Sequence, residues 1–170
     1  MDQNISATYA RSFRAKLYLQ AHSKTIPLRL SQNNDKFSWG LSPDNDWLQA
    51  GGDAPSLIIS FDYQSMTDNR LHYQVHIPGP RKNTPGPLVP RRLAISSNGY
   101  LGFYWTEEQS EHWKIEPLGE SEEGLLCHLR DHQGHRVATV QDDPHFQPGW
   151  FAYLNVHEGD IATFLLKRVD

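Results

Sequence analysis

An aromatic residue followed directly by leucine occurs three times in this chain at a constant interval. The three pairs, each 53 residues after the one before, are Trp47-Leu48, Tyr100-Leu101 and Tyr153-Leu154. A second series, with an interval of 54 residues, consists of Leu17, Leu71 and Leu125. Two independent series with almost the same period indicate three copies of one supersecondary unit. We therefore predict a single domain over residues 1–170, with repeats at approximately 13–66, 67–119 and 120–170.

The local patterns within each unit are those of strands. Apolar runs are four to six residues long, and the segment from Leu71 to Ile77 alternates between apolar and polar residues. Glycine and proline are frequent, with 12 and 11 copies, and Asn98-Gly99 and Gly134 lie where tight turns between strands are expected. No helical periodicity is long enough to assign, and residues 1–12 are predicted to be a polar lead-in. The patterns predict twelve strands, four in each unit.

The repeated unit resembles that of the β-trefoil fold. The segment Asn98-Gly99-Tyr100-Leu101, with Trp113-Lys114-Ile115 after it, is similar to the repeats of both ricin-B-like lectins and fascin-like proteins. Glu111-His112-Trp113 stands where ricin-B-like lectins carry Gln-x-Trp. The single cysteine, Cys127, excludes the intramolecular disulfides that many such lectins contain.

The resemblance implies an all-β chain in which equivalent apolar side chains from the three units pack around a pseudo-threefold axis. Because one unit cannot bury its apolar face alone, all three units must close together. The expected core layers are Leu17, Leu71 and Leu125, and Leu48, Leu101 and Leu154. The alternative architecture is a β-sandwich in which the spacing is a coincidence.

Three loops combine polar side chains with aromatic residues, as a sugar-binding site requires. A carboxylate or amide can bond to two hydroxyl groups, while an aromatic face stacks on the apolar side of the sugar ring. One such loop in each unit would suit a multivalent lectin. The candidate ligand-binding residues are Asp44, Asn45 and Asp46 beside Trp47; Asn98, Tyr104 and Trp105; and Asp142, Asp143, His145 and Trp150. The alternative is that Asp and Asn only make turns and that Trp47 packs in the core.

A proline-rich segment from Pro78 to Pro90 is expected to project as a loop, because proline cannot donate to a β-ladder. The candidate partner-binding residues in and beside this loop are Arg81, Lys82, Arg91 and Arg92. A basic patch on a chain of net charge −4 could meet a phosphate, an acidic protein surface or a sialylated glycan. The alternative is a solvated insertion without a partner.

Nine histidines are an unusual number for a chain of this size. His128, His132 and His135 lie in one predicted hairpin, and His72 and His76 share one strand face. No second cysteine or nearby glutamate completes a zinc site, so we expect neither a metal nor a cofactor. Protonation of several histidines could instead make binding pH-dependent, as in histidine-rich β-trefoils that bind actin filaments. The alternative is that these histidines are solvated surface residues.

The sequence favours binding over catalysis. It contains no Gly-x-Ser-x-Gly, phosphate loop or His-Glu-x-x-His motif, and Cys127 is expected to be a buried, inert thiol. The net charge of −4 gives no reason to expect nucleic-acid binding. Without a visible signal peptide or an apolar run of membrane-spanning length, we expect a soluble cytoplasmic protein, with secretion by another route left open.

These observations predict a noncatalytic, lectin-like module that binds carbohydrate. Its partner would be a glycan or a protein surface, and its oligomeric state is left open. Two alternatives remain open: a fascin-like trefoil that binds actin or another protein, and a trefoil protease inhibitor that presents the loop from Pro78 to Pro90.

Overall fold

The computed structural model describes residues 1–21, 23–31, 47–51, 55–79, 85–105, 111–142 and 151–169. These residues form one short helix and thirteen β-strands, which confirms the prediction of a mainly β chain. Their bounds are α1 (Gln3–Tyr9), β1 (Phe13–Ala21), β2 (Lys24–Leu30), β3 (Leu48–Gly51), β4 (Ile59–Thr67), β5 (Arg70–Gly79), β6 (Val89–Ile95), β7 (Leu101–Tyr104), β8 (Trp113–Ser121), β9 (Gly124–Arg130), β10 (Ala138–Asp142), β11 (Phe151–Asn155), β12 (Asp160–Ile161) and β13 (Thr163–Arg168).

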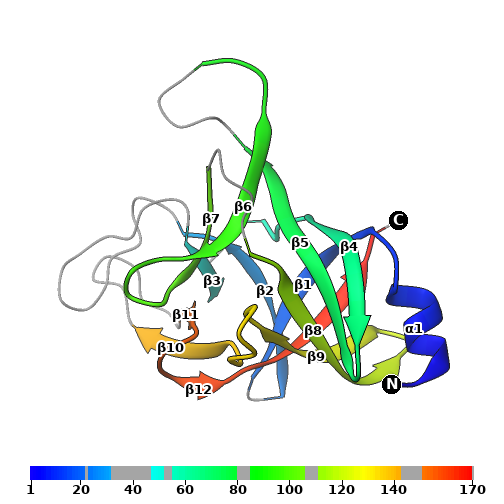
Figure 1. Cartoon of the computed structure of the whole chain (residues 1–170). Helices are drawn as coiled ribbons and strands as arrows, with labels where there is room; N and C mark the ends of the chain where they lie inside the picture. The colour runs from blue at the N-terminus through cyan, green and yellow to red at the C-terminus, as the bar shows by residue number, and fades with distance from the viewer. Residues whose placement is uncertain are drawn as a thin grey trace.

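Six of the strands form a closed ring. β1 pairs with β4, β4 with β5, β5 with β8, β8 with β9, β9 with β13, and β13 again with β1, all antiparallel. The closing pair joins the first strand of the chain to the last, with Leu17 opposite Leu166. Figure 1 shows β13 in red beside β1 in blue. Each ring strand therefore has a hydrogen-bonded neighbour on both of its edges over at least part of its length.

The interior of the ring is filled by apolar side chains that alternate along its strands. In β5, Leu71, Tyr73, Val75 and Ile77 are buried, as the alternation predicts. The residues of the two predicted leucine layers are all buried in one core cluster: Leu17, Leu71 and Leu125, and Leu48, Leu101 and Leu154. The three predicted units therefore share one core.

Three two-stranded hairpins, β2–β3, β6–β7 and β10–β11, lie on the side of the molecule away from α1 (Figure 1). β3 pairs with β11, and single bridges join Trp47 to Gly102 and Tyr100 to Asn155. The aromatic residues of the 53-residue series contact one another here. The rings of Trp47 and Tyr100 stack with centroids 4.5 Å apart, and Tyr153 meets them edge-on at 6.1 and 6.4 Å. This contact gives the constant spacing a physical reason.

The turn between β6 and β7 has the expected sequence but not the expected backbone. Asn-Gly can supply two residues with positive φ. Here Gly99 has a positive φ, of +88°, and Asn98 does not. The amide of Ser96 donates to the carbonyl of Tyr100 at 2.8 Å, and the amide of Gly99 donates to the carbonyl of Ser96 at 2.9 Å. These bonds define a three-residue loop that ends in a left-handed glycine.

A buried asparagine ties this turn to the third unit. The side-chain Nδ2 of Asn155, at the end of β11, donates to the backbone carbonyl of Asn98 at 3.1 Å. Its Oδ1 accepts from the backbone amides of His157 and Glu158 at 2.7 and 3.1 Å. Asn155 is fully buried, so the loss of these bonds would leave an unpaired amide in the interior.

The prediction of an irregular lead-in without helix was wrong. Residues 3–9 form α1, and the Asp2 carboxylate caps its first turn by accepting from the amide of Asn4 at 2.7 Å. Ile5 and Tyr9 are buried against the ring core, and the hydroxyl of Tyr73 donates to the carbonyl of Tyr9. A helix of seven residues has too few turns to give a periodic pattern in the sequence. Such a short helix is not stable by itself, and the burial of Ile5 and Tyr9 holds it in place.

Two predictions about strands also need correction. The number of strands is thirteen, because a two-residue strand, β12, pairs with β10 before β13 begins. The segment from Pro78 to Pro90 is not wholly a loop, because β5 extends to Gly79, β6 begins at Val89, and Pro78 lies opposite Pro90. At this point β5 has passed its last pairing with β4, at His76, so proline costs no ladder bond on that edge.

We predict that Gly99→Ala destabilises the protein by about 2 kcal/mol or more, because an L-residue pays roughly 1–2 kcal/mol in the left-handed region. A Cβ at this position would also lie 2.7 Å from Oδ1 of Asn155. Gly119→Ala is the matched control, since φ there is not positive and no atom lies within 4 Å of the added carbon. Urea unfolding measures both variants. Equal stability of the two would contradict the role of this turn.

Candidate functional site

Polar side chains gather on the outer face of β5, β8 and β9. Leu71, Ile115 and Leu129 lie opposite one another across these strands and point into the core. The residues beside them must therefore point outward, because strand side chains alternate. The outward residues fall into two cross-strand rows: His72, Lys114 and Arg130 in one, and Glu116 and His128 in the other.

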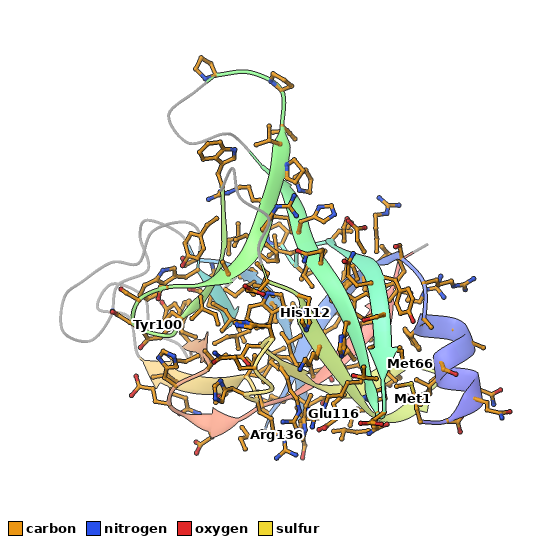
Figure 2. The ribbon with its side chains drawn as sticks, viewed as in Figure 1. Met1, Met66, Tyr100, His112, Glu116 and Arg136 are labelled. Carbon is orange, nitrogen blue, oxygen red and sulfur yellow. The ribbon has the colours of Figure 1, made fainter. Side chains whose placement is uncertain are left out.

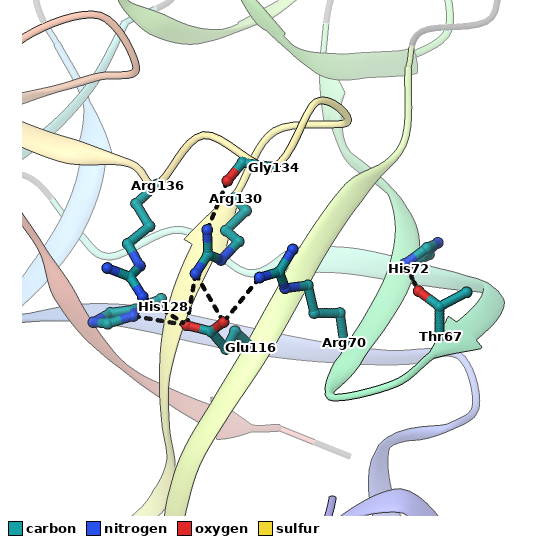
Figure 3. Close-up of polar contacts among 8 residues, drawn as sticks. All are labelled: Thr67, Arg70, His72, Glu116, His128, Arg130, Gly134 and Arg136. Atoms are coloured by element: carbon teal, nitrogen blue, oxygen red, sulfur yellow. Dashed lines mark hydrogen bonds and ion pairs between the residues drawn. The ribbon is translucent and has the colours of Figure 1, made fainter.

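Glu116 is the centre of this face, and we call the group around it the Glu116 cluster: Arg70, Glu116, His128, Arg130 and Arg136. Nη2 of Arg130 donates to both carboxylate oxygens of Glu116, at 2.8 and 3.1 Å. Three other groups lie close to the same carboxylate: Nη2 of Arg70 at 3.4 Å, Nδ1 of His128 at 3.0 Å, and Nη2 of Arg136 at 3.7 Å. Figure 3 shows these side chains converging on the carboxylate, and Figure 2 shows its place in the whole molecule.

The cluster keeps Glu116 ionised. Burial by itself would raise the pKa of Glu116, but the hydrogen bonds from His128 and Arg130 and the charges of Arg130 and Arg136 outweigh it. The pKa therefore lies below the usual value for glutamate. Because an ionised carboxylate only accepts hydrogen bonds, Nδ1 of His128 carries the proton in this contact.

The turn between β9 and β10 holds the cluster from one side. Gly134 has a φ of +93°, and its amide donates to the carbonyl of Asp131, so a tight turn forms where it was predicted. The flanking strands do not form the predicted hairpin, because β9 pairs with β8 and β13 and β10 pairs with β11 and β12; an isolated bridge joins Arg130 to Arg136. The carbonyl of Gly134 accepts from Nη1 of Arg130 at 2.7 Å. The buried carboxylate of Asp131 accepts from the amide of His135 at 2.8 Å and contacts its Nδ1 at 2.9 Å. The turn is thus rigid and contributes a backbone acceptor that orients Arg130.

A stack of histidines adjoins the cluster. The rings of His72 and His112 are parallel with centroids 4.8 Å apart, and His132 meets His112 edge-on at 6.5 Å. Ser65 and Thr67 bond to the two ring nitrogens of His72 at 3.3 and 2.9 Å. Burial, followed by the positive charge of neighbouring groups, lowers the pKa of both His72 and His112.

His128 and His135, in β9 and in the turn after it, do not converge. His128 bonds to Glu116 and His135 to Asp131, so each has its own carboxylate partner. Among the described residues, no group of three or more His, Cys, Asp or Glu side chains has an arrangement that could hold a metal ion. Cys127 is buried, as expected, and burial raises the pKa of its thiol to about 12. A thiol with this pKa is not a nucleophile at neutral pH.

Several predicted sugar-binding residues fall outside the described part of the chain: Asp44, Asn45, Asp46, Asp143, His145 and Trp150. Asp142 is the last residue of β10. Trp47 is partly buried and stacked on Tyr100, in agreement with the alternative interpretation that it packs with other residues.

The predicted group of Asn98, Tyr104 and Trp105 is not brought together. Asn98 is exposed in the turn before β7, whereas Tyr104 ends that strand and Trp105 follows it. Extended residues advance about 3.3 Å each, so the run from Tyr100 to Tyr104 separates the turn that carries Asn98 from Tyr104 by roughly 13 Å. Trp105 is partly buried.

The predicted basic loop is also divided. Arg81 and Lys82 lie outside the described residues, and Arg91 and Arg92 belong to β6. Consecutive strand residues point to opposite faces, so Arg91 and Arg92 cannot act as one patch. Arg91 packs over Gly79, and Arg92 lies opposite both His76 and Tyr104.

The sequence analysis missed the Glu116 cluster. A usable signal was the single charged residue in the apolar strand segment from Ile115 to Leu118. A second signal was the outward register of His128 and Arg130 between buried residues of β9. Neither signal identifies the partners of Glu116, which come from β5, from β9 and from the segment between β9 and β10.

We predict that Glu116→Gln lowers the free energy of unfolding by about 3 kcal/mol, because it leaves the largely buried guanidinium of Arg130 without its counter-charge. Asp62→Asn is the control, since its carboxylate is 52% exposed where it meets His76. An exposed pair contributes less than about 1 kcal/mol. Chemical unfolding at pH 7 compares the two variants. A loss in Glu116→Gln no larger than in the control would contradict the role of the cluster.

Acidification should destabilise the protein through the histidine stack. The folded state favours neutral His72 and His112, so below the ordinary histidine pKa of about 6.5 the unfolded chain binds protons that the folded chain does not. The free energy of unfolding should therefore decrease from pH 7 to pH 5. Glu116 contributes little to this decrease, because the ordinary glutamate pKa of the unfolded chain, about 4.5, lies below this range.

Urea unfolding at several pH values measures this effect. The decrease should be smaller in His112→Gln than in the parent protein. It should be unchanged in His157→Gln, which replaces an exposed histidine that has no contact with the stack among the described residues. The same pH dependence in the parent and in His112→Gln would contradict the prediction.

The described part of the chain contains no helix with the length and hydrophobicity needed to cross a membrane. Comparison of the chain with family models, with curated proteins and with solved structures gave no match. The case for a function therefore rests on the chemistry of the face formed by β5, β8 and β9.

Proposed function

We propose that this protein is a noncatalytic binding module with a β-trefoil fold, and that it binds carbohydrate on the outer face of β5, β8 and β9. The observation that carries the binding proposal is the concentration of charged side chains and histidine rings on this one face: the Glu116 cluster, Lys114, and the stack of His72, His112 and His132. The proposal moves the binding site away from the loops expected from sequence and keeps the lectin-like function.

The strand pairings support the trefoil. The six-stranded ring takes two strands from each predicted unit, and each unit adds one two-stranded hairpin. The hairpins contact one another pairwise through β3, β7 and β11. The rings of Trp47, Tyr100 and Tyr153, one from each unit, lie in mutual contact. In this assignment β12 is an insertion in the third unit.

The side-chain chemistry of the face supports a sugar ligand. Sugar hydroxyls both donate and accept, so a site that holds them needs both kinds of group. Lys114, Arg70 and Arg136 can donate, and the exposed side-chain amide of Gln133 in the turn at 131–135 can accept. His112 and His132 offer ring surfaces that are only partly buried, against which a sugar ring can pack. Nε2 of His112 is buried without a hydrogen-bond partner in the described structure, so a ligand or water could satisfy it.

A glycan array of the purified protein tests the proposal. Lys114→Gln should weaken binding about tenfold, because it removes one charge-assisted donor from the face. No described hydrogen bond depends on the Lys114 side chain, so the variant should fold normally. Lys167→Gln is the control, since Lys167 lies on β13, over the ring of Tyr18, and should not affect binding.

Trp105→Ala separates this face from the loop predicted by sequence. If Trp105→Ala loses glycan binding while Lys114→Gln binds as well as the parent protein, the sugar site lies at the end of β7 and the proposal is contradicted. Absence of binding to any glycan would overturn the carbohydrate function.

A second candidate function is the binding of a protein partner, as in the fascin-like alternative. A groove of about 520 Å³ supports it, with Ile58 and Leu88 exposed by 46% and 65% at its wall. Pro78 and Pro90 complete the apolar part, and Arg14 and His76 are its charged or titratable lining. Cosedimentation with actin filaments in the absence of glycan binding would favour this function. The inhibitor alternative remains a prediction from sequence, because residues 80–84 lie outside the described structure.

A further inference from the structure

We infer that the carbohydrate bound at this face carries an acidic group, a sulfate or a carboxylate, which is held between Arg70 and Arg136 above the Glu116 carboxylate. This inference rests on the proposed carbohydrate-binding function and names the chemical class of its ligand. It concerns a surface that the sequence analysis did not single out.

The cluster contains more positive charge than its own carboxylates neutralise. Arg70, Arg130 and Arg136 surround a single ionised glutamate at 3.4, 2.8 and 3.7 Å. The buried carboxylate of Asp131 faces His135 and belongs to the adjoining turn. Lys114 adds a further positive charge in the next cross-strand row. This excess occurs in a chain whose net charge is −4, so the charge is concentrated locally.

Arg130 is committed to the structure. Its Nη1 bonds to the carbonyl of Gly134 and its Nη2 to both oxygens of Glu116, and only 11% of its side chain is exposed. It places one positive charge against the single negative charge of Glu116 at close range. The charges of Arg70 and Arg136 are then in excess, so an approaching anion meets a cluster whose arginines outnumber its glutamate.

Arg70 and Arg136 keep most of their donors. Each guanidinium has five N–H groups. Arg70 uses one in a long bond of 3.4 Å to Glu116, and Arg136 is beyond hydrogen-bonding distance at 3.7 Å. Within the described structure neither side chain makes another hydrogen bond, and the two are 35% and 40% exposed. The two guanidiniums approach different oxygens of one carboxylate from its two sides (Figure 3), and guanidinium N–H groups match the geometry of sulfate and carboxylate oxygens.

The two arginines are held in position before a ligand arrives. Both are attracted to the same ionised carboxylate, which lies in the rigid strand β8. Nη1 of Arg70 also packs against the glycine turn, 3.6 Å from where a Cβ on Gly134 would lie. Glu116 therefore acts as an internal anchor that gathers the guanidiniums and reduces the entropy lost on binding.

A short acidic sugar fits this face better than a nucleic acid. A long polyanion binds through many phosphate contacts spread along its length. The cluster provides two free arginines on a protein that is acidic as a whole, so further phosphates would meet repulsion. One or two acidic groups on an oligosaccharide are sufficient to occupy it.

Isothermal titration calorimetry tests the inference with three probes: a sulfated glycosaminoglycan tetrasaccharide, a neutral tetrasaccharide of N-acetylglucosamine, and sodium sulfate. The sulfated sugar should bind at least tenfold more tightly than the neutral one, and its affinity should fall as salt is raised. The double variant Arg70→Gln/Arg136→Gln should lose at least tenfold in affinity for the sulfated sugar. Thermal unfolding of the variant establishes that it remains folded.

The matched control is Lys16→Gln/Lys167→Gln, which removes the same charge from two residues that lie opposite each other on β1 and β13. It should change the affinity for the sulfated sugar less than twofold. An equal loss in both double variants would overturn the inference, because net charge and not a site would then govern binding. Tighter binding of a single-stranded oligonucleotide than of the sulfated sugar would overturn it as well.

Two outcomes separate this inference from the proposed function. Equal affinity for the sulfated and the neutral sugar, unaffected by the arginine substitutions, would overturn the acidic-ligand inference and leave carbohydrate binding intact. Binding of sulfate alone, lost in the arginine variant, with no binding of either sugar, would support the anion site and overturn the carbohydrate function.

Discussion

Closure of the six-stranded ring is the constraint on which the rest of this structure depends. Each predicted unit presents an apolar face that it cannot cover by itself, so the unit becomes stable only when its neighbours complete the core. The pairing of β1 with β13 closes the ring by joining the two ends of the chain. The three hairpins then meet at one side, where Trp47, Tyr100 and Tyr153 pack together. These three aromatic residues, spaced 53 residues apart in the sequence, all lie at this one contact.

The same closure produces the proposed binding face. Once alternate residues of β5, β8 and β9 fill the core, the residues between them must point outward on three adjacent strands. Glu116 then lies among arginines that are distant in sequence, and its buried charge requires them as partners. A stable carboxylate thereby orders two arginines that remain available to an acidic ligand. The stability of the fold and the chemistry of the face thus both depend on the Glu116 carboxylate.

Sequence patterns predicted the elements of this structure better than its contacts. Strand length, turn glycines and the two leucine series follow from local chemistry, and Gly134 and the buried leucines lie as predicted. The Glu116 cluster could not be predicted, because its partners depend on pairing register. Register shifts between Tyr63 and Ser65 and between Pro117 and Gly119 change which residues lie opposite each other, and the local sequence does not identify those partners. Helix α1 was missed because two buried residues in seven form no recognisable period.

Nuclear magnetic resonance can locate the binding site of an acidic sugar on this protein directly. Titration of the isotopically labelled protein with the sulfated tetrasaccharide should shift the backbone amides of residues 70–74, 112–116 and 128–136. The side-chain resonances of Arg70 and Arg136 should shift with them. Shifts confined to the turn at Asn98, to Trp105 or to the groove beside Leu88 would place the ligand elsewhere and contradict the account. The absence of any shift at millimolar ligand would contradict it as well.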